Sequence, residues 1–235
     1  KETNGLFDPT IGVLVNAYGF GPNKKHQDLS QKQIDSLLQF VGFDKIALNS
    51  NKTISKKHNQ TFIDFNAIAQ GYSVDVVVNY LKSKGIENAI VEIGGEVVAE
   101  GHNAKGNPWR VGINKPVEDS TSTVSEIEQV VELTRGGMAT SGNYRNFYVE
   151  NGKKYSHTID PKSGYPVQHS LLSATILADD CMTADAYATA CMVMGLEQSL
   201  ELCRVRNDIE GYFIYDDHGA LKTVWSDGFP IQQDK

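Results

Sequence analysis

The 235-residue sequence predicts an α+β fold in which helices pack on mixed or antiparallel sheets. Two observations support this prediction. Short β-rich segments follow one another across turns rich in Gly, Asn or Lys, and helical patterns occupy only a few separate stretches. No regular alternation of strands and helices indicates a doubly wound parallel sheet. The length fits a single domain over residues 1–235 with two lobes, and the Ser/Thr/Glu-rich connection near 117–128 is a possible soft boundary between them.

Composition narrows the classes of function. A net charge of -7 and a pI near 5.4 argue against a nucleic-acid surface, and no Lys-rich or Arg-rich run changes that conclusion. An anionic ligand would therefore need a metal ion or backbone amides to bind. No apolar run approaches the length of a membrane-spanning helix. The three cysteines, Cys181, Cys191 and Cys203, lack the spacing of zinc ligands and are predicted to be buried or free thiols.

The first quarter of the chain predicts two short helices and three short strands. Asp8 and Pro9 are typical of a helix start, and the glycines around Phe20 would end that helix. Ser30 is the predicted N-cap of an amphipathic helix that runs to Phe40. Strands are predicted at 45–48, 53–56 and 61–65.

A longer helix is predicted between Asp64 and Gly85, because apolar residues recur there every four positions. The periodic face consists of Ile68, Tyr72, Val76 and Tyr80. Asp64 could simply cap this helix. A junction between a strand and a helix also presents free backbone amides and carbonyls, which suit a phosphate or a metal ion, so both interpretations of Asp64 stay open.

The rest of the chain predicts further strands and two more helices. Gly94 and Gly95 are typical of a tight turn between strands at 88–93 and 96–100. Further strands are predicted at 109–113, 129–133, 171–177, 211–215 and 221–225, and the last helix around 196–204. Small residues at 139–145 predict a turn, in which Thr140 and Ser141 are either turn formers or phosphate-binding hydroxyls.

Aromatic side chains lie in a glycine-rich segment near the start of the chain. Tyr18 and Phe20, on either side of Gly19, could fill a core or form a platform for a planar ligand, and the core alternative is favoured. Gly19 and Gly21 lack the third glycine and the strand context of a dinucleotide-binding fingerprint.

His157 comes just before Asp-Pro-Lys-Ser-Gly, a turn in which Pro161 fixes φ and Gly164 takes a positive φ. A histidine at the end of a predicted strand could accept a proton near neutral pH, although a lone histidine is more often structural.

Asp185 and Thr189 follow the predicted strand at 171–177, in an alanine-rich helix for which Thr183 is the predicted N-cap. Residues four apart project from one helix face, so this carboxylate and hydroxyl could offer two oxygens to one divalent cation. The alternative is that Asp185 only complements the helix dipole and that Thr189 only packs.

The order of these motifs along the chain resembles the ApbE family, the FAD:protein FMN transferases. The resemblance runs from about Phe7 to Trp225. The motifs that carry it are Phe-Asp-Pro-Thr-x-Gly, Asn-x-Tyr-Gly-Phe-Gly, the segment from Asp64 to Asp75, Glu-Ile-Gly-Gly-Glu, Ala-Thr-Ser-Gly-x-Tyr, His-x-Ile-Asp-Pro-x-Ser-Gly-x-Pro and Thr-Ala-Asp-Ala-x-Ala-Thr-Ala.

The resemblance implies a role for individual residues. Asp185 and Thr189 match side-chain ligands of Mg²⁺, and Ala67 matches a backbone carbonyl ligand. His157 matches a catalytic histidine. The positions expected to bind the flavin nucleotide are Tyr18, Gly19, Phe20, Asp64, Thr140, Ser141 and His157. Two positions depart from the family pattern: Gln70 replaces a common Lys, and Glu96 replaces a common Asp. Gln70 removes a positive charge that could meet a phosphate, so phosphate affinity is the property that this replacement would change.

The implied activity is the Mg²⁺-dependent transfer of FMN from FAD to a threonine hydroxyl of an acceptor protein, with release of AMP. The alternatives are an FAD pyrophosphatase that releases FMN and AMP, and a protein that binds FAD without chemistry. The resemblance also implies an N-terminal section that precedes this sequence, and a lipoprotein anchored on the extracytoplasmic, periplasmic side of the inner membrane. The expected partners are FAD and the acceptor protein, and no nucleic acid is expected.

Overall fold

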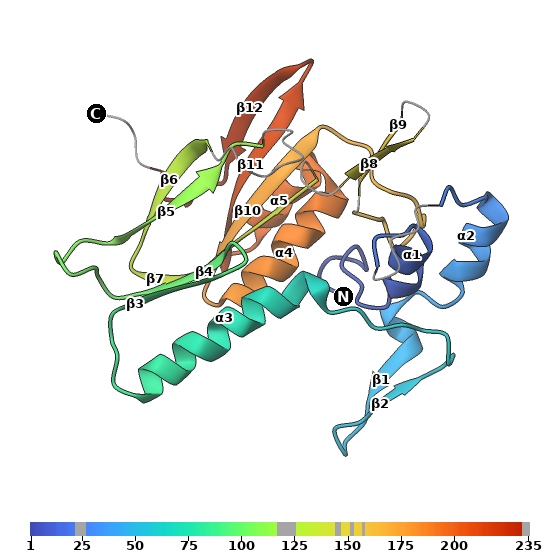
Figure 1. Ribbon diagram of the computed structural model, residues 1–235, viewed down its shortest axis with the longest axis horizontal. Helices are drawn as coiled ribbons and strands as arrows, with labels where there is room; N and C mark the ends of the chain where they lie inside the picture. Colours follow the sequence, from blue (N-terminus) through green and yellow to red (C-terminus); the bar gives the residue numbers. More distant parts are fainter. Residues whose placement is uncertain (22–26, 117–125, 144–146, 151–152, 157, 232–235) are drawn as a thin grey trace. The chain divides into compact units, whose positions relative to one another are not determined.

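The computed structural model describes residues 1–21, 27–116, 126–143, 147–150, 153–156 and 158–231 (Figure 1). The chain divides into two compact units. Unit 1 comprises Lys1–Phe65 and Asn146–Gln168, and unit 2 comprises Asn66–Arg145 and His169–Lys235. Helices occur together with antiparallel sheets, which confirms the predicted α+β class. The predicted connection near 117–128 falls mainly outside the described ranges, so a lobe boundary there stays a prediction.

A six-stranded antiparallel sheet forms the centre of unit 2. In spatial order its strands are β12 (Ala220–Trp225), β11 (Ile209–Asp217), β10 (Leu171–Ala178), β7 (Arg135–Gly142), β4 (Glu96–Glu100) and β3 (Ala89–Ile93). All but β7 match predicted strands. The predicted tight turn joins β3 to β4, and its two glycines, Gly94 and Gly95, have φ of 69° and 111°, a region that other residues rarely adopt.

Side chains alternate between the two faces of this sheet, and each face has its own core. Phe213 belongs to one core, whereas its neighbours Tyr212 and Ile214 belong to the other. The first face is covered by α3 (Asn66–Ser83), α4 (Cys181–Met194) and α5 (Leu196–Val205) (Figure 1). The second face packs against the hairpin of β5 (Trp109–Asn114) and β6 (Ile127–Leu133). Unit 2 therefore has three layers, with the six-stranded sheet between a layer of helices and the β5–β6 hairpin.

Helix α4 packs directly on β7 and β10 and lies against α3. The approach is close: a Cβ atom added to Gly137 of β7 would lie 2.4 Å from the Cys181 nitrogen. The turn predicted at 139–145 is wrong for 139–142, because these residues continue β7 through the middle of the sheet. The small residues of β7 make room for α4 rather than for a change of chain direction.

Two carboxylates hold the N-terminus of α4. Asp180 is the N-cap, and its carboxylate accepts from the Thr183 amide at 2.8 Å. Asp75 of α3 accepts from the amides of Cys181 and Met182 at 2.9 and 2.8 Å. The predicted N-cap Thr183 is therefore wrong by three residues, because the Asp180 carboxylate takes both the amide and the hydroxyl of Thr183.

Replacing Asp75 with alanine is expected to lower the free energy of unfolding of unit 2 by about 2–3 kcal/mol, because two helix amides lose a charged acceptor. Urea unfolding followed by tryptophan fluorescence measures this change, since both tryptophans, Trp109 and Trp225, are in unit 2. Asp179→Ala is the control, because Asp179 is exposed and should change stability by less than about 0.5 kcal/mol. Equal effects of the two substitutions would contradict the capping role of Asp75.

Helix α3 confirms the helix predicted between Asp64 and Gly85, but its periodic apolar face is not the face that packs. Tyr72, Val76 and Tyr80 are exposed by 57%, 48% and 61%. The buried residues of α3 are Gly71, Val74 and Val78. The helix therefore meets α4 and the sheet through small and β-branched side chains.

Unit 1 is built from short elements around a separate apolar core that includes Leu14, Tyr18 and Ile34. These elements are α1 (Gly12–Ala17), α2 (Gln31–Leu38), the 3-10 helix η1 (Phe43–Lys45), the strand pair β1 (Ile46–Leu48) and β2 (Ile54–Lys56), and the strand pair β8 (Phe147–Glu150) and β9 (Lys153–Ser156). Ser30 is the N-cap of α2, as predicted, and its amide donates to Gln33 Oε1 at 2.9 Å.

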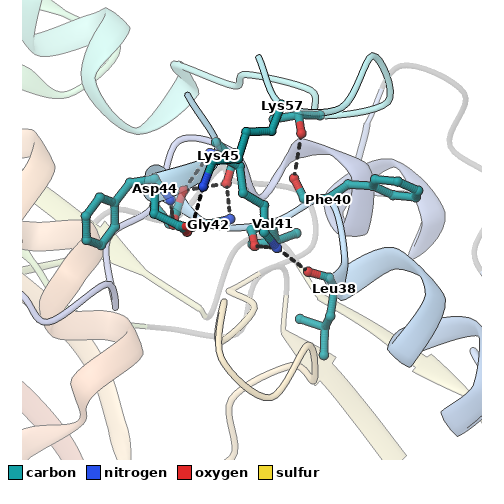
Figure 2. Close-up of polar contacts among 11 residues, drawn as sticks. Leu38, Phe40, Val41, Gly42, Asp44, Lys45 and Lys57 are labelled. Atoms are coloured by element: carbon teal, nitrogen blue, oxygen red, sulfur yellow. Dashed lines mark hydrogen bonds and ion pairs between the residues drawn. The ribbon is translucent and has the colours of Figure 1, made fainter. Parts of the chain in front are cut away.

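The connection from α2 into β1 is held by polar contacts around η1 (Figure 2). The Lys45 ammonium donates to the carbonyls of Leu38 and Val41, at and just after the end of α2. The Leu38 carbonyl is at the C-terminal end of α2, where backbone carbonyls carry partial negative charge, so a cation is favourable there. Lys57 forms an exposed ion pair with Asp44 at 3.3 Å.

The Phe-Asp-Pro-Thr motif is bound to the same turn. The buried Asp8 carboxylate accepts from the amides of Thr10 and Phe43 at 2.9 and 2.7 Å. The Thr10 hydroxyl, also buried, accepts from the Gly42 amide at 2.6 Å. These bonds place Asp8 in a turn, so α1 begins at Gly12 rather than at Pro9 as predicted. The motif thus has a structural function in unit 1.

The strand predicted at 61–65 is not formed, and Phe62 makes only an isolated bridge with Ile11. Polar groups of this segment bond to loops instead of a partner strand. The Thr61 hydroxyl donates to the Phe40 carbonyl at 3.0 Å, and the Asp64 amide donates to the Pro9 carbonyl at 2.7 Å.

The three cysteines, Cys181, Cys191 and Cys203, are buried free thiols, as predicted. Within the described ranges, no helix is both long and apolar enough to cross a membrane.

Candidate functional site

The centre of the candidate site is the contact between the second turn of α3 and the second turn of α4. The Gly71 amide donates to Asp185 Oδ2 at 3.1 Å, and Asp185 is only 5% exposed. In an α-helix the carbonyl of a residue lies beside the amide four positions later, so the Ala67 carbonyl lies next to this same Gly71 amide. The structure therefore brings Ala67 and Asp185, 118 positions apart in the sequence, to one place.

Thr189 lies one turn after Asp185 on α4, on the same side of the helix. Its hydroxyl is 3.2 Å from the hydroxyl of Ser141 on β7. A hydrogen bond at this distance restricts the rotamers of both side chains. Ser141 therefore lies with the predicted metal ligands, in a position to orient Thr189.

Thr140 lies elsewhere, although it is the neighbour of Ser141. Successive residues of a strand face opposite sides of the sheet. The Thr140 hydroxyl is 2.8 Å from that of Thr175, its cross-strand partner on β10. Of the two hydroxyls predicted to bind a phosphate, only Ser141 is on the α4 side of the sheet.

Two carboxylates near the second turn of α4, Asp185 and Glu96, are buried. Burial raises the pKa of Asp185, and the bond from the Gly71 amide opposes this rise. Burial, and then the charge of Asp185, raise the pKa of Glu96 to about 7. Among the described residues, neither carboxylate forms an ion pair with Lys, Arg or His, and Glu96 Oε2 has no hydrogen-bond partner.

These groups fit a hard divalent cation. A carboxylate, a hydroxyl and a backbone carbonyl are oxygen donors of the kind that Mg²⁺ prefers. A buried carboxylate oxygen without a partner is costly, and a cation would satisfy it. No group of three or more His, Cys, Asp or Glu side chains in the described part of the chain is arranged to hold a metal ion, so any such site must also use hydroxyl and carbonyl oxygens.

The raised pKa of Glu96 predicts how stability depends on pH without metal. Since this carboxyl loses its proton near pH 7 when folded and near 4.5 when unfolded, the folded state holds more protons between these values and stability falls as pH rises. In EDTA, the stability of the wild type relative to Glu96→Gln should decrease by roughly 2 kcal/mol from pH 5 to pH 8. Urea unfolding followed by tryptophan fluorescence measures this change in the free energy of unfolding. If the stability of the two proteins changed with pH in the same way, the raised pKa of Glu96 would be disproved.

The predicted flavin-binding aromatic segment lies in unit 1. The Tyr18 ring is 1% exposed in the core, and its hydroxyl donates to the Gly164 carbonyl at 3.0 Å. Gly19 has φ of 82°, which ends α1, and Phe20 is partly buried against the same core. Tyr18 therefore has the core position that the sequence favoured, and a role of this segment in flavin binding stays a prediction.

The Asp-Pro-Lys-Ser-Gly turn is confirmed in unit 1. Gly164 has φ of 74°, its amide donates to the Asp160 carbonyl at 2.8 Å, and the Lys162 amide donates to the Asp160 side chain at 2.9 Å. Asp64 is partly buried at the end of the first segment of unit 1. His157, the predicted catalytic residue, lies outside the described residues.

Sequence reasoning did not single out Gly71, Asp75 or Glu96, which lie at or near this site. Gly71 and Asp75 stand in the segment from Asp64 to Asp75, but nothing local shows that they meet α4. Glu96 was noted only as a departure from a common Asp. Its signal is a carboxylate directly after a tight turn, followed by three apolar residues of the strand Glu96–Glu100.

Curated relatives are similar over almost all of this chain. An FAD:protein FMN transferase of Haemophilus influenzae is 41% identical over 233 residues, which cover 97% of this chain and 66% of the relative. An FAD:protein FMN transferase of Escherichia coli K12 is 34% identical over 232 residues, which cover 97% of this chain and 65% of the relative. The chain thus spans just under two thirds of the length of these relatives.

Solved structures agree with the fold. The flavin transferase ApbE from Vibrio cholerae superposes with a TM-score of 0.83 at 37% identity, covering 97% of this chain and 71% of that one. The apbe protein from Thermotoga maritima superposes with a TM-score of 0.82 at 29% identity, covering 96% of this chain and 71% of that one. The family comparison matches residues 1–213 to the ApbE family. The chain therefore belongs to the ApbE family.

Proposed function

We propose that this protein transfers FMN from FAD to a threonine hydroxyl of an acceptor protein in a Mg²⁺-dependent reaction that releases AMP. The observation that carries the proposal is the bond between Gly71 and Asp185, because it brings the Ala67 carbonyl and the Asp185 carboxylate together one helical turn from Thr189. The relatives named FAD:protein FMN transferase support the choice of FAD as substrate and of a protein as acceptor.

The residues of unit 2 would act by holding and orienting oxygen donors. The Gly71 amide fixes one oxygen of Asp185, and Ser141 is placed to orient the Thr189 hydroxyl. A magnesium ion held by Asp185, Thr189 and the Ala67 carbonyl would neutralise pyrophosphate oxygens of FAD and the charge that develops on AMP. Because the protein carries a net charge of -7, the pyrophosphate needs such local compensation.

The reaction exchanges one phosphorus–oxygen bond for another. The threonine oxygen forms a bond to the FMN phosphorus, and the bond from that phosphorus to the AMP phosphate oxygen breaks. The threonine proton must leave during this step, and we assign its acceptance to His157 on the motif match alone.

The test is to incubate the protein with FAD, Mg²⁺ and a candidate acceptor domain, with and without EDTA. Denaturing gel fluorescence detects flavin bound covalently to the acceptor, and nucleotide chromatography detects AMP. With Mg²⁺ we expect a fluorescent acceptor and one AMP released for each flavin attached, and with EDTA we expect neither product. Free FMN and AMP without labelled protein would favour the pyrophosphatase, and intact FAD with tight binding would favour a protein that only binds FAD.

A further inference from the structure

Glu96 is a buried carboxylate, and one of its two oxygens has no partner among the described residues. It is the first residue of β4, directly after the Gly94 and Gly95 turn, and it is only 7% exposed. Its Oε2 atom has no hydrogen-bond partner among the described residues. Leaving such an oxygen buried and unpaired costs free energy, so a native structure normally provides a ligand or a function for it.

The side chain of Gln70, from the second turn of α3, ends near this carboxylate. A Cβ atom added to Gly94 would lie 3.4 Å from Glu96 Oε2 and 1.9 Å from Gln70 Nε2. Glu96 and Gln70 therefore meet under one turn. Gln70 directly precedes Gly71, whose amide binds Asp185. Glu96 on the sheet and Asp185 on α4 are thus each close to one of two neighbouring residues of α3, Gln70 and Gly71.

Electrostatic coupling between the two carboxylates agrees with this placement. The charge of Asp185 raises the pKa of Glu96, and both groups raise the pKa of the nearby Cys181 thiol. Such coupling requires the carboxylates to be near each other and poorly screened. When both groups are ionised, a cation between or beside them would offset their repulsion.

We propose that Glu96 is a second carboxylate of the divalent-cation site, acting with Asp185 to bind the ion directly or through a water ligand. The inference rests on the proposed magnesium site and goes beyond it, because the ligand set of Ala67, Asp185 and Thr189 does not include Glu96. Two carboxylates balance the charge of one divalent ion. The ion would also provide the missing partner of Glu96 Oε2.

The test measures cation binding without flavin or acceptor, using Mn²⁺ as the probe. Free Mn²⁺ is quantified by electron paramagnetic resonance during titration of the protein at pH 8. Glu96→Gln keeps the size of the side chain and removes its charge, and it should weaken Mn²⁺ binding about 10–100-fold. Glu96→Asp keeps the charge and should restore most of the affinity. Glu92→Gln is the matched control, because Glu92 lies in the same hairpin and also influences the pKa of Glu96, but is exposed. The Mn²⁺ affinity of this control protein should stay within about twofold of the wild type, since water and salt screen an exposed charge.

The outcomes separate this inference from the proposed function. Equal Mn²⁺ affinity of Glu96→Gln and the wild type, with binding lost in Asp185→Asn, would overturn the role of Glu96 and leave the metal site intact. A wild type that does not bind Mn²⁺, or an unchanged Asp185→Asn, would overturn both. Urea unfolding in EDTA at pH 8 excludes misfolding, since Glu96→Gln removes charge repulsion and should be at least as stable as the wild type.

Discussion

Replacing Asp185 with asparagine is expected to lower the Mg²⁺-dependent release of AMP from FAD by at least about 100-fold. Asparagine preserves the size of the side chain and can still accept from the Gly71 amide, but it lacks the charge that would bind the cation. Nucleotide chromatography at several Mg²⁺ concentrations measures the loss. The same variant should be as stable as the wild type or more so in EDTA, because a buried charge has been removed.

The two measurements together distinguish a lost ligand from a damaged fold. Asp179→Asn is the control, since Asp179 is an exposed carboxylate just before α4 and should leave activity unchanged. Retention of more than about half of the Mg²⁺-dependent activity by Asp185→Asn would contradict the assignment of Asp185 as a ligand.

Replacing Gly71 with alanine is expected to destabilise unit 2 by about 2–3 kcal/mol and to weaken cation binding at the same time. The added Cβ would lie 2.4 Å from the Cys181 carbonyl oxygen and 2.9 Å from Asp185 Cβ. The obstacle is the backbone of α4, which cannot turn aside as a flexible side chain would. Helix α3 and α4 must therefore separate, and the Ala67 carbonyl would move away from Asp185.

Replacing glycine with alanine inside a helix usually stabilises a protein, by up to about 1 kcal/mol, so a loss of stability in Gly71→Ala would be opposite in sign. Asn79→Ala is the matched control at an exposed position of α3, and it should leave stability unchanged or slightly increased. Urea unfolding and Mn²⁺ titration of both variants provide the comparison. A Gly71→Ala protein with normal stability and normal Mn²⁺ affinity would show that α3 and α4 do not need this close approach.

The half of the site that lies on one helix could be predicted from the sequence. Asp185 and Thr189 are four residues apart, and helical periodicity alone puts them on one side of α4. The contribution of Ala67 could not be derived in this way, because a backbone carbonyl has no sequence signature. Only the tertiary contact between Gly71 and Asp185 brings it to the site, and the sequence prediction relied on family resemblance.

Tertiary packing also explains the main errors in the fold. Small residues at 139–142 have the composition of a turn, but they belong to a central strand. On the side of β7 that faces α4, Gly137, Ala139 and Ser141 are small, and at Gly137 the backbone of α4 leaves no room for a side chain. Tyr72, Val76 and Tyr80 have helical periodicity and yet remain largely exposed, whereas Gly71 is buried. Periodicity identifies the helix, but which of its faces packs depends on how closely the neighbouring helix approaches.

Because the three thiols are buried, their rate of reaction with a thiol reagent would measure how often unit 2 opens. Burial raises the pKa of Cys191 and of Cys203 to about 12, and it also raises that of Cys181, so almost no thiolate exists at neutral pH in the folded state. A thiol reagent reacts with the thiolate and needs access to it, so modification must wait for α4 or α5 to detach. The modification rate would then report how often α4, which carries Asp185 and Thr189, separates from the sheet. An ion bound at those residues should slow that reaction in proportion to its occupancy.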